Sequence, residues 1–218
     1  MALVELRVLV GPNPDIPAPA IRVTLSGLRP GDPDPCEVVD RIARTAHAYV
    51  GPAVCRPGPD GTRVVVFPWQ QEGTGEALGE ALAEVLSDRS DAPLADRIER
   101  AAQHVRAADP GPAPRVIDAE VPAVAVTGTN GKTTTTRLLG RMAAEAGLLA
   151  AWSSTDGVYV AGHCVDPGDW SGPGGAREVL TQAGVGFAVL ETARGGLMLR
   201  GMGVSAVDVA VLGETVEI

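Results

Sequence analysis

One segment of this chain constrains the fold more than any other. Residues 121–126 are nearly all apolar, which is typical of a strand covered on both faces of a sheet. A turn containing Gly128 and Gly131 follows, and residues 133–146 then carry a helical pattern. A buried strand, a glycine-rich turn and a helix start, in this order, are the context of a phosphate-binding loop. We therefore expect a parallel sheet with a phosphate site at the end of this strand.

The residue types of the turn fit a bound triphosphate. The two glycines let the backbone curl so that successive N–H groups face an oxyanion, and the helix start adds the positive end of its dipole. Lys132 would place its ammonium group on the terminal phosphates, and the Thr133 hydroxyl is suited to bind Mg²⁺. We therefore predict ATP and Mg²⁺ as ligands, with ATP bound by Gly128, Thr129, Asn130, Gly131, Lys132, Thr133 and Thr134.

The match to the strict loop pattern is incomplete. Val126 occupies the position where Gly-x₄-Gly-Lys-Ser/Thr has its first glycine, so the chain carries the shorter Gly-x-x-Gly-Lys-Thr form. The alternative interpretation is an ordinary strand-to-helix turn with an exposed lysine. The agreement of several functional residue types with the strand and helix context favours the phosphate loop.

A candidate metal-binding carboxylate follows another buried strand. Glu191 comes directly after the apolar residues 187–190. The carboxyl ends of strands in open α/β sheets border the crevice where ligands bind. Beside a phosphate loop, this carboxylate would bind Mg²⁺ directly or through water. The alternative is a glutamate at a strand end that faces only water.

Composition excludes several classes of function. The net charge of −9 is spread over both halves without a basic stripe, which argues against nucleic-acid binding. Three widely spaced cysteines indicate reduced thiols in a cytoplasmic protein rather than a disulfide framework, and the histidines and cysteines show no metal-ligand spacing. No apolar run approaches the ~18 residues of a membrane span, and the N-terminus lacks signal-peptide features. We expect no membrane contact.

The chain divides at a Pro- and Gly-rich stretch over residues 109–114. We predict a small α+β domain over residues 1–109, a linker over 110–120, and an ATP-binding domain over 121–218. The first domain is expected to contain strands at 4–10 and 21–25, a helix that Asp34 caps, a hairpin at 53–67, and helices at 76–86 and 94–108. The second is expected to be α/β, with strands at 121–126, 148–152, 187–190 and 207–212, helices at 133–146 and 174–183, and a long loop before the latter.

Four motifs of the second half resemble the Mur ligase superfamily and, within it, the cyanophycin synthetases. They are Thr-Gly-Thr-Asn-Gly-Lys-Thr-Thr at 127–134, Ser-Thr-Asp-Gly-Val-Tyr at 154–159, Gly-Asp-Trp-Ser-Gly-Pro at 168–173 and Glu-Thr-Ala-Arg-Gly-Gly-Leu at 191–197. Residues 6–13 also resemble the start of those enzymes. Cyanophycin synthetases extend an Asp/Arg polymer with two ATP-dependent centres.

The resemblance implies a reaction and assigns residues to it. A carboxylate attacks the γ-phosphate of ATP to give an acyl phosphate, and an amine then displaces phosphate to form an amide. Lys132 and Glu191 would be catalytic, and Thr133 and Glu191 would hold Mg²⁺. Residues near the acceptor carboxylate would be Thr155, Asp156, Asp169, Ser171 and Arg194. The implied substrates include an amino acid or an acidic peptide polymer, and the resemblance is compatible with an oligomer.

The chain departs from the family pattern at two places. The first half leads almost directly into the Mur-like loop, without room for an ATP-grasp domain. The strand at 207–212 continues into Gly-Glu-Thr-Val-Glu-Ile rather than into the family's Asp-His pair and C-terminal domain. We therefore expect a ligase that is incomplete as this chain. The alternatives are a non-catalytic or vestigial ATP-binding protein and an unrelated P-loop NTPase. The sequence leaves open which carboxylate and amine are used.

Overall fold

The structure is a computed structural model that describes residues 2–48, 51–114 and 116–213. Its contacts divide the chain into two compact units. The first unit comprises Met1–Leu9 and Ala18–Pro114, and the second comprises Val10–Pro17 and Arg115–Ile218. Residues 10–17, which the sequence assigned to the first domain by position, are thus grouped with the second unit.

The first unit contains a four-stranded antiparallel sheet. Its order is β1 (Ala2–Leu9), β2 (Ala20–Ser26), β4 (Arg63–Pro68), β3 (Val54–Pro57). In β2, Ile21, Val23 and Leu25 alternate with partly exposed residues and are fully buried, because alternate side chains of a strand point to the same face. Strands β3 and β4 form the hairpin expected from the sequence, joined by a short 3₁₀ turn at Pro59–Gly61.

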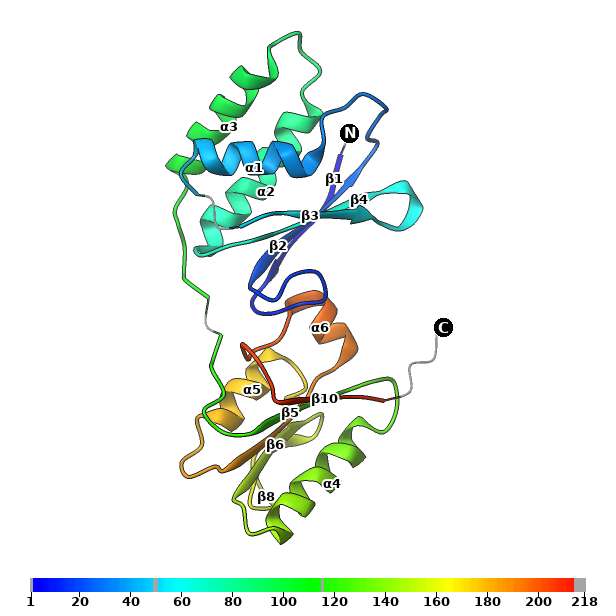
Figure 1. Cartoon of the computed structure of the whole chain (residues 1–218), viewed down its shortest axis with the longest axis vertical. Coiled ribbons are helices and arrows are strands. Elements are labelled where there is room, and N and C mark those ends of the chain that lie inside the picture. The colour runs from blue at the N-terminus through cyan, green and yellow to red at the C-terminus, as the bar shows by residue number, and fades with distance from the viewer. Residues whose placement is uncertain (1, 49–50, 115, 214–218) are drawn as a thin grey trace. The chain divides into compact units, whose positions relative to one another are not determined.

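Three helices complete the first unit: α1 (Pro35–Thr45), α2 (Glu72–Ser87) and α3 (Leu94–Ala107). Apolar residues of all three helices join those of β2 and β4 in one core cluster, so the helices cover one face of the sheet (Figure 1). The Asp34 side chain accepts a hydrogen bond of 2.7 Å from the Cys36 backbone N–H, which confirms the predicted helix cap. Residues 110 and 112 accept hydrogen bonds from the first N–H groups of α2.

The structure corrects the expectation of reduced thiols. Cys36, in the first turn of α1, and Cys55, on β3, form a disulfide with a Cα–Cα distance of 6.0 Å. Cys164, in the second unit, is free and exposed. The spacing of 19 residues gave no indication of this pair, because only the packing of α1 beside β3 brings the two sulfur atoms together.

The second unit is an α/β structure built on a mixed six-stranded sheet. Strands β10, β5, β9 and β6 are parallel, and β7 and β8 extend the sheet with antiparallel pairings. The sheet order is β10 (Val209–Leu212), β5 (Ala123–Thr127), β9 (Phe187–Glu191), β6 (Ala150–Ser154), β7 (Gly157–Val160), β8 (His163–Pro167). The predicted α/β class is confirmed. The long loop predicted before the helix at 174–183 is wrong in part, because strands β6 and β7 form a hairpin joined by a two-residue turn after Ser154.

Helices cover both faces of this sheet, as predicted. Alternate strand residues divide between two apolar clusters, one of which contains Ala176 and Val179 of α5 (Pro173–Leu180). The other contains Trp152 and packs against Leu139 of α4 (Lys132–Glu145). A Cβ atom at Gly140 would lie 2.6 Å from the Trp152 ring, so glycine is needed for α4 to lie this close to the sheet. This packing fixes the helix that begins at the phosphate loop.

Residues 10–17 are held to the turn that follows α6 (Arg194–Arg200). The Val10 N–H donates to the Arg200 carbonyl and the Met202 N–H donates to the Pro12 carbonyl, both at 2.7 Å. A Cβ atom at Gly11 would lie 1.7 Å from the Met202 carbonyl oxygen, so only glycine fits there. These contacts explain why the segment is grouped with the second unit.

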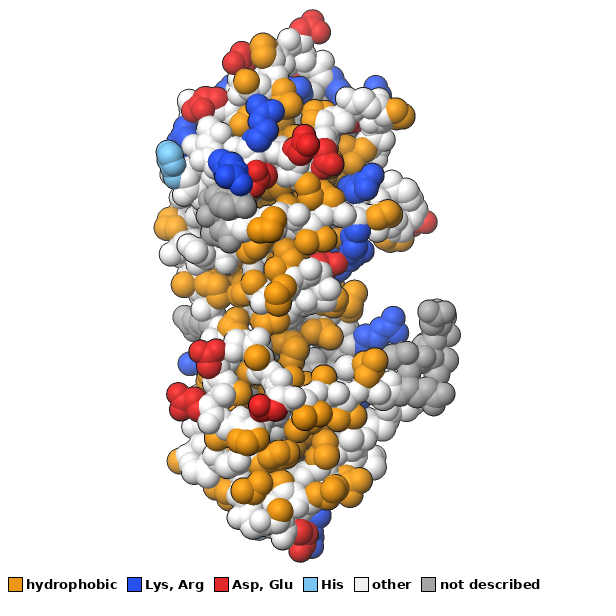
Figure 2. Space-filling view, viewed as in Figure 1, with side chains coloured by type: hydrophobic (Ala, Val, Ile, Leu, Met, Phe, Trp, Pro, Cys, Tyr) orange, Lys and Arg blue, Asp and Glu red, His pale blue; other side chains and the backbone are white. Residues whose placement is uncertain are grey.

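The second unit also exposes apolar side chains. On α4, Leu138 and Met142 lie one helical turn apart and are about 60% exposed. On the edge strand β10, Val209 and Leu212 are also exposed. Figure 2 shows hydrophobic side chains at the surface of this unit. Among the described residues, no helix is both long and apolar enough to cross a bilayer.

Candidate nucleotide-binding site

The phosphate loop, residues 127–134, connects the carboxyl end of β5 to the start of α4. Its backbone is curled: Gly128 has φ +142°, and Gly131, the residue before α4, has φ +79°. L-residues with a Cβ rarely adopt these angles, so both glycines are required by the turn. The first N–H groups of a helix lack intrahelical partners, and here they open onto the loop. The local geometry is therefore that of an anion-binding turn.

The Lys132 side chain folds over this turn. Its Nζ atom donates hydrogen bonds to the carbonyl oxygens of Gly128 at 3.0 Å and Thr129 at 3.1 Å. The ammonium group therefore lies above the loop that a phosphate would occupy. An incoming phosphate oxygen would compete with these two carbonyls for the ammonium protons.

Glu191 and Thr133 meet at the same edge of the sheet. The Thr133 hydroxyl donates to Glu191 Oε1 at 3.1 Å and lies 3.3 Å from the Thr155 hydroxyl. These side chains come from the start of α4, the end of β9 and the turn after β6. The Glu191 side chain is buried, and its Oε2 atom has no hydrogen-bond partner among the described residues. One carboxylate oxygen beside two hydroxyls is a donor set that suits a hard divalent cation.

Burial raises the pKa of the Glu191 carboxyl, because removal from water penalises the charged form. The Thr133 hydroxyl, the Lys132 ammonium and the Thr155 backbone oppose this effect and lower the pKa, whereas the Asp156 carboxylate raises it further. Burial outweighs the stabilising groups. The site thus contains a carboxylate whose charge is only partly compensated by the protein.

Backbone hydrogen bonds join the sequence motifs at this edge. The Trp170 N–H donates to the Ser154 carbonyl and the Ala193 N–H donates to the Ser171 carbonyl, both at 2.9 Å. The Thr192 N–H donates to the Val126 carbonyl at 2.8 Å. The three predicted substrate motifs and the phosphate loop are therefore contiguous in the fold, although they span 71 residues of sequence, from 127 to 197.

The residues predicted to approach the acceptor differ in their surroundings. Asp156 is exposed, and its pKa is lowered by a hydrogen bond from the Ser154 hydroxyl and by the ion pair with Arg137. The sequence did not single out Arg137, although its place one helical turn after Thr133 puts it on the same face of α4. Through this pair, α4 contacts the turn after β6.

Asp169 and Ser171 form a local pair. The Ser171 hydroxyl donates to Asp169 Oδ1 at 2.7 Å, and the Ser171 backbone N–H donates to the same atom at 3.0 Å. These two bonds lower the pKa of Asp169. Arg194 is exposed in the first turn of α6 and has no ion pair with the described residues. No hydrogen bond or ion pair links its side chain to Asp169 in the described part of the chain.

Comparison with known proteins agrees with this geometry. Residues 126–214 match the Mur ligase middle domain. Over these residues the chain is therefore similar to the Mur ligases. Over 92 residues, the chain is 47% identical to cyanophycin synthetase from Synechocystis sp. and 45% identical to cyanophycin synthetase from Trichormus variabilis. Each match covers 42% of this chain and 10% of the relative, so the matched segment spans about a tenth of the length of these curated relatives.

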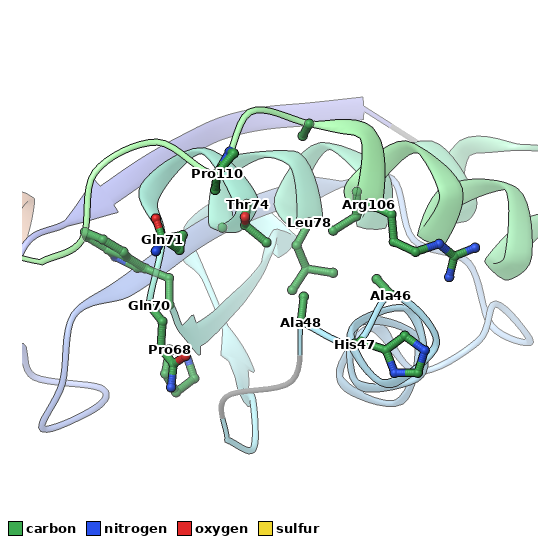
Figure 3. A pocket seen from close by; sticks show the side chains of 14 residues that line it. Ala46, His47, Ala48, Pro68, Gln70, Gln71, Thr74, Leu78, Arg106 and Pro110 are labelled. Atoms are coloured by element: carbon green, nitrogen blue, oxygen red, sulfur yellow. The ribbon is translucent and has the colours of Figure 1, made fainter.

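A cavity of about 360 Å³ lies outside the Mur ligase middle domain, in the first unit (Figure 3). Figure 3 shows Leu78 pointing toward Ala48, whereas the Arg106 guanidinium extends away from them. That guanidinium is already bonded to the Thr45 carbonyl and to Glu99. Polar side chains such as Gln70, Gln71 and Thr74 also line this cavity, but none of the four sequence motifs contributes to it, so it is not the proposed nucleotide site.

Replacing Gly128 by alanine should damage the Mur ligase loop more than replacing Gly131 by asparagine. A Cβ atom at position 128 would lie within 2.9–3.1 Å of three backbone atoms of Gly213, in addition to its positive φ. At position 131 nothing lies within 4 Å, and asparagine tolerates the left-handed region. We expect Gly128→Ala to cost about 1–3 kcal/mol of stability. Thermal unfolding of both variants measures this, and equal losses would contradict the expected backbone contact.

Proposed function

We propose that the second unit is the ATP-binding part of an amide-forming ligase that activates a carboxylate as an acyl phosphate. The proposal goes beyond the similarity to Mur ligases and states a reaction mechanism. It also assigns residues 1–109, apart from the segment 10–17 that is grouped with the second unit, to a separate domain, 110–120 to a linker and 121–218 to the ATP-binding domain. The observation that carries it is the 3.1 Å contact between the Thr133 hydroxyl and the buried Glu191 carboxylate beside a curled phosphate loop.

The phosphate loop would bind the triphosphate through its curled backbone and the first N–H groups of α4. Lys132 would exchange its two carbonyl partners for phosphate oxygens and offset the negative charge there. The partnerless Oε2 of Glu191 and the Thr133 hydroxyl fit a Mg²⁺ ion, with Thr155 as a neighbouring oxygen donor. A Mg²⁺ ion held by Glu191 and Thr133 would offset the negative charge that develops during phosphoryl transfer.

The proposed reaction has two steps. An oxygen of the substrate carboxylate attacks the γ-phosphorus, the bond to the bridging oxygen breaks, and ADP leaves. An amine nitrogen then attacks the carbonyl carbon, phosphate leaves with one original carboxylate oxygen, and the amine loses a proton. The residues proposed to approach the acceptor are Thr155, Asp156, Asp169, Ser171 and Arg194. An acidic peptide as carboxylate donor and an amino acid as amine are proposed from the likeness to cyanophycin synthetases.

Isotope transfer tests this function. The chain is incubated with Mg-ATP, an aspartate peptide labelled with oxygen-18 in its carboxylates, and arginine. Activation through an acyl phosphate followed by attack of the amine predicts oxygen-18 in the released phosphate together with an amide product. ATP binding without phosphate release would instead favour a non-catalytic nucleotide-binding protein. Phosphate release that is independent of the peptide and the amine would favour an unrelated NTPase.

A further inference from the structure

Three metal-binding side chains meet in the first unit. Asp34 and Cys36 lie at the N-terminus of α1, and Cys55 lies on the edge strand β3. One carboxylate oxygen and the two Sγ atoms all lie within 4.8 Å of one another. The fold brings these three donors together from two separate segments.

We propose that Asp34, Cys36 and Cys55 bind a thiophilic divalent cation such as Zn²⁺ when the Cys36–Cys55 disulfide is reduced. Zn²⁺ binds sulfur at about 2.3 Å and carboxylate oxygen at about 2.0–2.2 Å. These distances hold in the disulfide form, so once the S–S bond is broken, side-chain rotations that separate the two sulfur atoms can place all three donors around one ion. Two thiolates and one carboxylate leave a fourth position for water, as in three-ligand zinc sites.

The local electrostatics favour a cation between these donors. Two thiolates beside a carboxylate repel one another unless a positive charge lies among them. Asp34 is already held in place, because its carboxylate caps α1 through the 2.7 Å hydrogen bond from the Cys36 N–H. The Asp34 side chain is exposed and both cysteines are only partly buried, so an ion from solvent can reach them.

The disulfide and the metal-bound form exclude each other, because the ligand is the thiolate. Reduction by a dithiol breaks the Cys36–Cys55 bond and transfers two electrons and two protons to the two sulfur atoms. The dithiol becomes a disulfide. Binding of the cation then releases the two thiol protons to solvent. The same pair thus has an oxidised form that joins α1 to β3 covalently and a reduced form that joins them through an ion.

Zinc titration of the whole chain tests this proposal. The protein is reduced with dithiothreitol, desalted without air, and titrated with Zn²⁺ against a chromophoric chelator. Co²⁺ serves as a second probe, because thiolate ligands give it charge-transfer absorption. We expect one ion per chain, thiolate-to-Co²⁺ absorption, and no binding to the oxidised protein. Absence of stoichiometric binding by the reduced protein would overturn the proposal.

Four variants separate the site from non-specific thiol binding. Cys36→Ser and Cys55→Ser should each weaken Zn²⁺ binding by about a hundredfold or more, since even outer-sphere changes cost 10–100-fold. Asp34→Asn keeps a good helix cap but removes the anionic ligand, so about a tenfold loss is expected with the fold intact by circular dichroism. Cys164→Ser should bind like the wild type. Wild-type affinity in Cys55→Ser or Asp34→Asn, or loss of binding in Cys164→Ser, would contradict the assignment.

Discussion

Replacing Lys132 by alanine should lower the affinity for Mg-ATP by about a hundredfold or more, corresponding to roughly 2.7 kcal/mol or more. The expected size reflects the loss of a charge-assisted contact to the terminal phosphates inside a curled loop. In the structure the ammonium already lies over this loop, bonded to the Gly128 and Thr129 carbonyls. Isothermal titration calorimetry with Mg-ATP measures the change directly.

A matched control lies on the same helix. Arg141 is an exposed cation of α4 that pairs with Glu145, two and a half turns after Lys132. Arg141→Ala removes the same charge at a distance from the loop and should leave Mg-ATP affinity nearly unchanged. If Lys132→Ala and Arg141→Ala bind Mg-ATP equally well, the phosphate-loop assignment fails.

Replacing Glu191 by glutamine should have opposite effects on stability and on magnesium-dependent binding. The free protein should become more stable by about 1 kcal/mol, because a buried carboxylate with a partnerless oxygen becomes a neutral amide. Nucleotide binding should lose its dependence on Mg²⁺, because the anionic metal ligand is removed. Thermal unfolding measures the first effect, and calorimetry with and without Mg²⁺ measures the second. The control is Glu145→Gln, which makes the same change at an exposed glutamate.

The same substitution predicts a pH dependence of defined sign. Burial raises the folded-state pKa of Glu191 above its ordinary value of 4.5, so the folded state binds the proton more tightly than the unfolded chain. This group therefore adds stability below pH 4.5, and the stability is lost as pH rises through the folded pKa. The difference in stability between Glu191→Gln and wild type should grow with rising pH across this window and then stay constant. A difference that shrinks with rising pH would contradict the raised pKa.

Much of the candidate site could be predicted from the sequence because its chemistry is local. Gly128 and Gly131 take the positive φ angles that the turn requires, and Lys132 and Thr133 follow at the start of the predicted helix. The contact between Thr133 and Glu191 spans 58 residues, yet it followed from the rule that parallel strands end at one edge of a sheet. The predicted α/β class and the helices on both faces of the sheet are confirmed as well, because the alternation of strands and helices is visible along the sequence.

Other features could not be read from local pattern. Strands β7 and β8 lie in a stretch rich in Gly, Asp and Pro, where weak alternation concealed them. Arg137 pairs with Asp156 because the fold places the turn after β6 beside α4, which the sequence does not indicate. The role of residues 10–17 was equally hidden, since their hydrogen bonds are to residues 200–202, far along the chain.

The sequence by itself determined the strand, turn and helix of the phosphate loop, because backbone angles and helix starts depend on neighbouring residues. Only the tertiary structure decided which distant groups meet: Cys36 with Cys55 in the first unit, and the Glu191 carboxylate, buried and incompletely paired, with Thr133 and Thr155 in the second. Such pairings depend on how helices and strands pack, and a single sequence carries no local signal for the side chains that packing brings within a few ångströms.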